Sequence, residues 1–269
     1  MKSFLDNESS QSLDLYNKGL SAVPGSVWQN LELEKLNLAD NKLTLISDKI
    51  GNLINLTMLD LGHNKLSALP ESLGKLTKLK FLYLSNNKLS SAPQPLWGLK
   101  TLVYLNITDN QLSSLPEDIG HLSNLIELRL YNNQLVSLPE SIGLLKNLRE
   151  LHVMGNQLTS LPASIGKLKN LRKLVLEGNG IASLPDSLGN LKNLTDLDLR
   201  NNRLNELPNS IGKLKGLRFL DLRANQLTTL PAGIMKLQNL EKLDLRWNKS
   251  FSIPKWLAKL EGRSCIVYT

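Results

Sequence analysis

The chain has 269 residues, 41% of them hydrophobic and 21% charged, a balance typical of a soluble globular protein. Its length allows one or two domains, and its net charge of +8 permits loose contact with anions without selecting a ligand. The single cysteine, Cys265, excludes an intramolecular disulfide and argues against a disulfide-stapled extracellular domain.

The N-terminal residues do not resemble a leader. Lys2 follows Met1, but acidic residues come soon after and no apolar stretch intervenes, so the segment does not match a cleavable signal peptide. A leader removed upstream of this sequence stays an open alternative. No apolar run approaches the roughly 20 residues that a membrane-spanning helix needs, so we expect no such helix.

A leucine-rich unit of 23 residues repeats along nearly the whole chain. Its pattern is L-x-x-L-x-L-x-x-N-x-L-x-x-L-P-x-x-I-G-x-L-x-x, and Leu13, Leu15 and Leu20 keep the same register upstream of the regular units. A register this long leaves no room for a second domain. The regular units begin at Leu33, Leu56, Leu79, Leu102, Leu125, Leu148, Leu171, Leu194, Leu217 and Leu240.

Residues 125–147 illustrate how one unit should fold. Leu128 and Leu130 alternate with outward-facing neighbours, which predicts a short strand with one buried face. Pro139 fixes φ and lacks a donor, so it suits a turn or the start of a short helical or 3-10 segment. Gly143 suits a tight return toward the next strand. One unit buries too little apolar surface to offset its backbone entropy, so neighbouring units must stack.

An asparagine occupies the ninth position of every regular unit. It follows the predicted strand and precedes a buried leucine, so its amide should lie inside and bond to the backbone of its own turn and of the adjacent turn. The N-terminal equivalent is Lys18, whose charge requires that this end faces water. The asparagines are Asn41, Asn64, Asn87, Asn110, Asn133, Asn156, Asn179, Asn202, Asn225 and Asn248.

We predict a single domain over residues 1–269. Residues 1–32 should form an N-terminal cap with a degenerate first repeat, residues 33–248 the regular repeats, and residues 249–269 a C-terminal cap. Terminal repeats need atypical covers because only one of their faces meets a neighbour.

Several bulky residues depart from the consensus. Trp28 and Trp97 stand where the unit has glycine, and we interpret both as packing variants. At the C-terminal end, Ile266 and Tyr268 continue the buried positions of the last strand, which places Cys265 on the outward face.

The runs LPESIGLLKNLREL (138–151) and LPDSLGNLKNLTDLDLRNNRL (184–204) resemble the 23-residue leucine-rich repeat family. This resemblance implies an α/β solenoid: a right-handed curved horseshoe with a concave parallel β-sheet and short helical, 3-10 or turn segments on its convex side. It also implies that the protein is a protein-interaction module or scaffold.

The repeats are similar to those of intracellular scaffold proteins that associate with Ras-type GTPases, and to those of bacterial repeat proteins, some of them secreted effectors. The resemblance therefore makes a small GTPase or another signalling protein a candidate partner. The paired cysteine caps of extracellular members are missing, which favours a cytoplasmic location. An exported bacterial effector without a cleavable signal peptide is the alternative.

If the fourth- and sixth-position leucines point inward, the residues beside them form outward columns on rungs about 4.8 Å apart. Aromatic residues are only 5% of the chain, yet four of them crowd consecutive rungs of these columns. Exposed apolar surface marks a binding site, whereas stacking across a solvated sheet is the alternative. We call this predicted protein-binding group the central patch: Met58, Phe81, Tyr83, Tyr104, Arg129, Tyr131, His152 and Met154.

Two charged columns run side by side in the C-terminal half. They either orient a partner or form a solvated ion-pair ladder. Trp247, which follows them, either extends the contact surface or packs the cap, and packing is favoured. A metal at the acidic column is disfavoured because the arginines compete for its oxygens. We call these columns the charged ladder: Asp198, Arg200, Asp221, Arg223, Asp244 and Arg246.

A basic strip should line one rim of the C-terminal half, where it could bind anions or nucleic acid, or could simply aid solubility. No nucleic-acid module accompanies it, so nucleic acid is an unlikely partner. No HExxH, CxxC, Walker or Gly-x-Ser-x-Gly pattern appears, so we expect no enzyme, catalytic residue, metal or cofactor. We expect the protein to be a monomer or a weak homo-oligomer. The strip comprises Lys146, Arg149, Lys169, Arg172, Lys192, Lys215 and Arg218.

Overall fold

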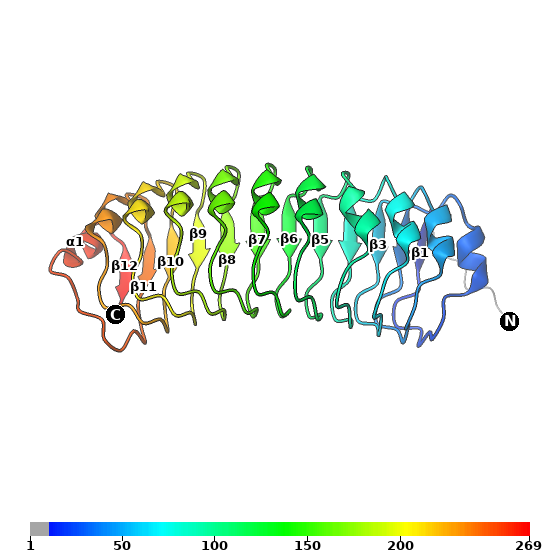
Figure 1. Ribbon diagram of the computed structural model, residues 1–269, viewed down its shortest axis with the longest axis horizontal. Coiled ribbons are helices and arrows are strands. Elements are labelled where there is room, and N and C mark those ends of the chain that lie inside the picture. Colours follow the sequence, from blue (N-terminus) through cyan, green and yellow to red (C-terminus); the bar gives the residue numbers. More distant parts are fainter. Residues whose placement is uncertain (1–10) are drawn as a thin grey trace.

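The computed structural model describes residues 11–269, so the first ten residues of the predicted N-terminal cap lie outside the described part. Twelve short strands form one parallel sheet in which each strand pairs with its neighbours in chain order (Figure 1). The strands are β1 (Ser12–Asp14), β2 (Lys35–Asn37), β3 (Met58–Asp60), β4 (Phe81–Tyr83), β5 (Tyr104–Asn106), β6 (Glu127–Arg129), β7 (Glu150–His152), β8 (Lys173–Val175), β9 (Asp196–Asp198), β10 (Phe219–Asp221), β11 (Lys242–Asp244) and β12 (Ile266–Tyr268).

A short 3-10 helix follows each strand except the last two, and the final helical turn is an α-helix. Most 3-10 helices begin directly after the proline of the unit, as the fixed φ of proline predicts. The helices are η1 (Gly25–Gln29), η2 (Asp48–Asn52), η3 (Glu71–Lys75), η4 (Gln94–Gly98), η5 (Glu117–His121), η6 (Glu140–Leu144), η7 (Ala163–Lys167), η8 (Asp186–Asn190), η9 (Asn209–Lys213), η10 (Ala232–Lys236) and α1 (Ala258–Glu261).

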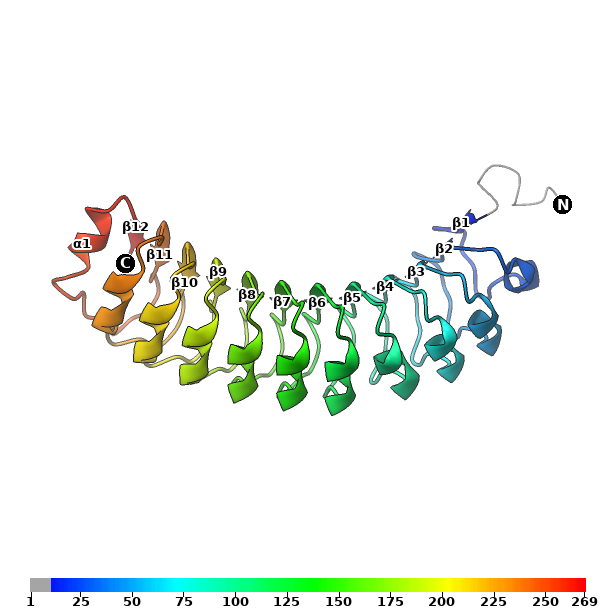
Figure 2. The ribbon, with the colours of Figure 1, turned by 90° about the horizontal axis from the view of Figure 1, so that it is seen from above.

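The coils stack into a curved solenoid with strands on the inside of the curve and 3-10 helices on the outside (Figure 2). One continuous core of leucine and isoleucine side chains fills the space between these two layers. The predicted solenoid with a concave parallel sheet is therefore confirmed. Among the described residues, no helix has the length and apolar character required to cross a bilayer.

Nine of the ten ninth-position asparagines are buried and one is half-buried, and all of them join consecutive coils, as predicted. The side-chain amide of Asn133 donates to the carbonyl oxygens of Ile107 and Leu130, at 2.9 and 3.0 Å, and its oxygen accepts from the backbone N–H of Leu112 at 3.0 Å. Each amide thus satisfies the backbone of its own coil and of the coil before it. At the N-terminal end, Lys18 is exposed to water as expected.

A second asparagine column, which the consensus does not include, lies at the last position of many units. Asn147 donates from its side chain to the carbonyl oxygen of Ser123 in the preceding unit, at 2.9 Å. Asn170 and Asn193 repeat this bond to Lys146 and Lys169. These side chains tie the coils together along the edge of the sheet opposite to the ninth-position column.

Glycine recurs at the nineteenth position of most units for a different reason from the one expected. Gly143 does not adopt a positive φ, so it is not needed for a tight return. A Cβ atom at this position would lie 2.6 Å from the carbonyl oxygen of Ser164, in the next 3-10 helix. Glycine is therefore required because consecutive 3-10 helices approach closely. Trp28 and Trp97, which replace it in two units, are buried, in agreement with their interpretation as packing variants.

The last rung departs from the predicted register. Lys242 in β11 pairs with Ile266 in β12, one residue later than the 23-residue repeat requires. Cys265 is consequently buried, and the expectation that it faces outward was wrong. Ile266 and Tyr268, expected inside, are 55% and 40% exposed. The additional residue lies between β11 and β12, and the repeat pattern cannot anticipate it because the cap abandons that pattern.

The buried amide of Asn133 should be essential to stability. Asn133→Ala leaves the backbone N–H of Leu112 without its partner, which should lower the free energy of unfolding by about 1–3 kcal/mol. Urea denaturation followed by circular dichroism measures this loss. Gln134→Ala, which changes an exposed neighbour, is the control. Equal stability of both variants would contradict the role given to the amide.

Close approach of the 3-10 helices predicts that Gly143→Ala is destabilising by about 1–3 kcal/mol, the usual range for overpacking. The matched control is Gly98→Ala, because a Cβ atom there meets nothing within 4 Å. Thermal melts of the two variants should show a lower Tm only for Gly143→Ala. If both melt as the wild type does, the glycine is not needed for packing.

Candidate functional site

The strands β3 to β7, with the residues that follow β6 and β7, carry the central patch on the concave face of the sheet. Tyr83, Arg129 and Tyr131 are half-buried and do not turn into the core, as their positions beside inward-facing leucines require. Phe81 is the most exposed aromatic residue of the central patch, at 39%. The parallel pairing puts Met58 next to Phe81 and Phe81 next to Tyr104 on adjacent rungs. The predicted residues therefore do form one contiguous group.

Two tyrosines and one arginine are packed together at the middle of the patch. The ring centroids of Tyr83 and Tyr104 lie 4.9 Å apart, and the guanidinium carbon of Arg129 lies 5.7 Å from the Tyr104 ring centroid. Burial raises the pKa of both tyrosine hydroxyls, so both stay neutral at physiological pH. The patch therefore offers rigid aromatic surface and a cation held in place by Glu127.

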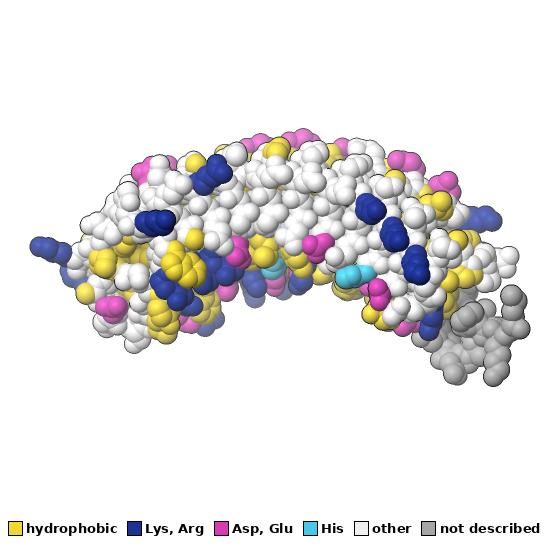
Figure 3. Space-filling view, turned by 90° about the horizontal axis from the view of Figure 1, so that it is seen from below, with side chains coloured by type: hydrophobic (Ala, Val, Ile, Leu, Met, Phe, Trp, Pro, Cys, Tyr) yellow, Lys and Arg dark blue, Asp and Glu magenta, His cyan; other side chains and the backbone are white. Residues whose placement is uncertain are grey.

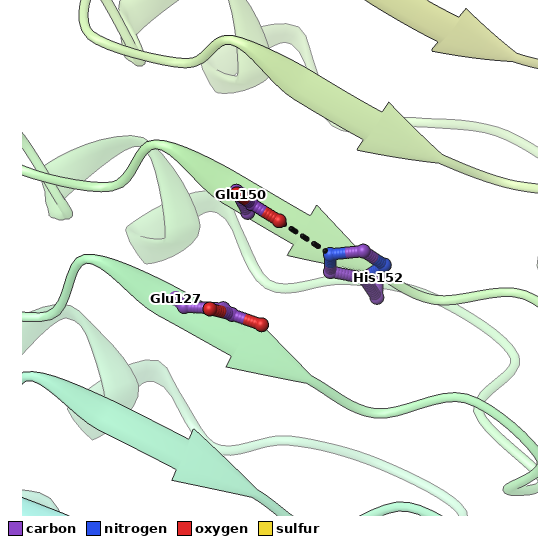
Figure 4. Close-up of side chains that lie close together, drawn as sticks. All are labelled: Glu127, Glu150 and His152. Carbon is purple, nitrogen blue, oxygen red and sulfur yellow. Dashed lines mark hydrogen bonds and ion pairs between the residues drawn. The ribbon is translucent and has the colours of Figure 1, made fainter.

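His152 was expected on the exposed surface of the central patch. It points out of the sheet, but it is only 9% exposed. Its Nε2 atom lies 3.0 Å from a carboxylate oxygen of Glu150, and Glu127 lies on the neighbouring strand (Figure 4). Within the described residues, Glu127, Glu150 and His152 form the only group of three whose possible metal-ligand atoms all lie within 4.8 Å of one another. Because Glu127 is paired with Arg129 and Glu150 is hydrogen-bonded to His152, a cation would have to displace both contacts, and we assign no metal to this group.

The charged ladder forms a continuous ion-pair network across β9, β10 and β11. Arg223 donates to Asp221 on its own rung at 2.7 Å, and its Nε atom lies 3.6 Å from Asp244 on the next rung. Arg200 bonds in the same way to Asp198 and also reaches Glu177. Arg200 and Arg223 thus each reduce the repulsion between carboxylates on neighbouring rungs.

One of the two interpretations was a solvated ion-pair ladder, but part of the ladder is buried. Asp244 is 0% exposed, covered by Arg246, Arg223 and Lys242. Burial alone would raise the pKa of Asp244, but the hydrogen bonds and positive charge of Arg246, together with the charge of Arg223, lower it below its ordinary value. The carboxylate therefore stays ionised inside the ladder.

A shallow pocket of about 230 Å³ lies beside the ladder, and no prediction named it. Lys173 and Lys242 stand in its lining together with the apolar Val175 and Phe219. The sequence signal that could have found it is the third-position column, where lysine, aspartate and phenylalanine alternate over β8 to β11.

Trp247 is a functional candidate whose exposure was not predicted from the sequence. Packing against the cap was favoured for it, but its side chain is 66% exposed, so that expectation was wrong. The guanidinium carbons of Arg223 and Arg246 each lie 5.7 Å from its ring. The tryptophan therefore stands on the charged ladder and faces solvent.

The basic strip is partly used within the protein. The ammonium group of Lys146 donates to the carbonyl oxygen of Gly143 at 3.0 Å, and that of Lys192 donates to Gly189 at 3.1 Å. Arg218 is paired with Glu241 on the next rung. Such bonds satisfy carbonyls at the ends of 3-10 helices and neutralise part of the strip.

Two family models match the chain. The model of the leucine-rich repeat region matches residues 86–177 and 163–263, and that of the leucine rich repeat matches residues 31–89. No curated protein matches the chain.

Solved structures with the same fold come from bacteria and plants. A leucine-rich repeat protein of Leptospira interrogans is 30% identical, with 96% of this chain and 95% of that one covered and a TM-score of 0.50. The functional domain of InlJ from Listeria monocytogenes is 25% identical, with 91% and 55% covered and a TM-score of 0.78.

The ectodomain of the plant membrane receptor kinase GASSHO1/SCHENGEN3 from Arabidopsis thaliana, in complex with CASPARIAN STRIP INTEGRITY FACTOR 2, is 31% identical, with a TM-score of 0.61. That match covers 83% of this chain and 34% of the receptor. The chain thus spans nearly all of the Leptospira protein, about half of the InlJ functional domain and a third of the plant receptor ectodomain.

Burial of the ionised Asp244 carboxylate predicts that the free energy of unfolding depends on pH. Because its pKa is lowered on folding, it adds stability above the ordinary aspartate pKa of about 3.9, and this stability is lost as the pH falls through the lower folded-state value. Asp244→Asn should lower the free energy of unfolding by about 1.5–3 kcal/mol at pH 7 and by less at pH 3. Urea denaturation at both pH values measures the difference.

The control for this experiment is Asp186→Asn, which changes an exposed acid at the start of η8. It should follow the wild type at both pH values. A gap between Asp244→Asn and the wild type that stays the same from pH 7 to pH 3 would refute the assignment of an ionised buried carboxylate.

Proposed function

The chain belongs to the leucine-rich repeat family, a fold that commonly serves as a protein-interaction module, and from this we propose that it binds a protein partner through the central patch. The observation that carries the proposal is the contiguous aromatic surface built on Phe81, Tyr83 and Tyr104, on β4 and β5 of the concave sheet. Tyrosine and arginine are residue types enriched among binding hot spots.

The geometry of the patch favours binding at low entropic cost. Tyr83 and Tyr104 are already in contact, and Arg129 is held against Tyr104 and Glu127. Side chains that are ordered before a partner arrives lose little conformational freedom on binding. Stacking across a solvated sheet, the alternative, would produce the same contacts but no loss of binding when the tyrosines are removed.

A protein or peptide is the proposed class of partner. The plant receptor that shares this fold was solved with a bound factor, which supports this class by analogy. A small GTPase is one candidate, because the repeats are similar to those of Ras-associated scaffolds. We propose a binding role without catalysis or cofactor, in the cytoplasm, as a monomer or weak homo-oligomer; an exported bacterial effector using the same surface is the alternative.

Anion or nucleic-acid binding through the basic strip is the second candidate function. Arg149 and Arg172 are exposed on the strip, and Arg149 also lines a shallow groove of about 450 Å³ with Lys80. Binding of this kind would weaken steeply as salt is raised and would be lost in Lys169→Glu/Arg172→Glu. The internal bonds of Lys146 and Lys192 favour the protein partner instead.

Removal of two tyrosines tests the proposed function. Tyr83→Ala/Tyr131→Ala should reduce capture of the wild-type partners at least about tenfold, because each ring contributes hot-spot surface at the middle of the patch. Affinity capture with quantitative mass spectrometry measures the change, and circular dichroism checks that the fold is intact.

The matched control removes two exposed apolar side chains outside the sheet, in Val136→Ala/Leu144→Ala. This control should capture the same partners as the wild type. Undiminished capture by the tyrosine variant would exclude the central patch as the binding site.

A further inference from the structure

Trp247 occupies a backbone conformation that tryptophan rarely adopts. Its φ is 65°, in the left-handed region, where a bulky side chain is unfavourable. Nearly every unit has a left-handed residue directly before its ninth-position asparagine, because the chain must turn sharply out of the strand. In the other units this residue is small or polar: Asp40, His63, Asn86, Asp109, Asn132, Gly155, Gly178, Asn201 and Ala224.

Apart from contacts with two arginine side chains, the side chain of Trp247 gains little from the fold in return. It is 66% exposed, so most of its apolar surface stays in water. Among the other residues of the column, asparagine is the commonest type and tolerates this conformation well. Folding alone would therefore favour asparagine here, and an unfavourable, exposed residue that persists is a signal of function.

The residues around Trp247 hold it in a defined orientation. Arg223 and Arg246 lie against its ring, and Arg246 also lies 4.8 Å from the ring centroid of Tyr268. Arg246 is in turn fixed by the buried Asp244, to which it donates at 2.6 Å. The result is a guanidinium between two exposed aromatic rings. Hydrophobic and basic side chains gather at this end of the solenoid in Figure 3.

The accessible charge at this end is mostly positive. Asp244 is fully buried, and its charge is compensated by the two arginines, whereas Lys242 and Arg246 are 42% and 40% exposed. The exposed Lys249 lies two residues after Trp247. A partner that covers both rings would therefore place its own charge next to these cations, and a carboxylate suits them best.

We infer that Trp247, Arg246 and Tyr268 form a second binding site on the protein, specific for an acidic protein segment that carries an aromatic side chain. The aromatic side chain of the segment packs against Trp247 and Tyr268, and its carboxylates pair with Arg246 and Lys242. This site lies at β11 and β12, several rungs from the central patch, so it rests on the proposed function only in assuming that the partner is a protein.

The test uses a fluorescein-labelled peptide of about eight residues in which glutamate and phenylalanine alternate, with fluorescence anisotropy as the readout. The full chain should bind this peptide more tightly than matched Glu/Ala and Lys/Phe peptides. Trp247→Asn, which installs the residue favoured elsewhere in the column, should weaken binding at least tenfold without lowering the Tm. Tyr16→Ala, which removes an exposed aromatic residue at the opposite end, should leave binding unchanged.

The outcomes separate this site from the central patch. Tyr83→Ala/Tyr131→Ala should bind the Glu/Phe peptide as the wild type does, even where it loses its captured partners. The inference is overturned if the wild type does not bind the peptide, if Trp247→Asn binds it equally well, or if Trp247→Asn melts at a clearly lower temperature. A dimer in light scattering that disappears in Trp247→Asn would assign the surface to a second copy of the chain and would also overturn it.

Discussion

The buried amides of the ninth-position asparagines fix the position of each coil relative to the one before it. Every such side chain bonds to backbone groups of two coils, as Asn133 does with Leu112, Ile107 and Leu130. A buried amide without these partners would cost about as much as several favourable contacts provide, so no coil can shift by one residue without penalty. Apolar burial drives the coils together, and the amides determine their register.

This constant register is what turns a repeated sequence into a functional surface. Because residues at the same unit position lie on adjacent rungs, three or four substitutions in successive units create one continuous patch. The aromatic cluster around Tyr83 and Tyr104 and the ion-pair network around Arg223 arise in this way. The scaffold and the binding surface use different positions of the unit, so the surface can change without disturbing the core.

The repeat pattern predicts the regular coils well and their exceptions badly. The strands, the inward leucines and the buried asparagines follow from periodicity and polar satisfaction. The shifted register of β12 and the exposure of Trp247 do not, because the cap abandons the pattern and the contacts of its residues depend on a single tertiary arrangement. The burial of Asp244 and His152 was missed because neighbouring long side chains cover residues that the alternation places on the outward face.

Chemical footprinting of the protein with and without its captured partner tests the central claim most directly, namely that the outward residues of the middle strands meet the partner. Carbene labelling at Phe81, Tyr83 and Tyr131 should fall when the partner is bound, while labelling at Val136 and Leu144, away from the sheet, should not change. Protection of Val136 and Leu144 with no change at the aromatic residues would contradict the claim, because the partner would then bind outside the concave face.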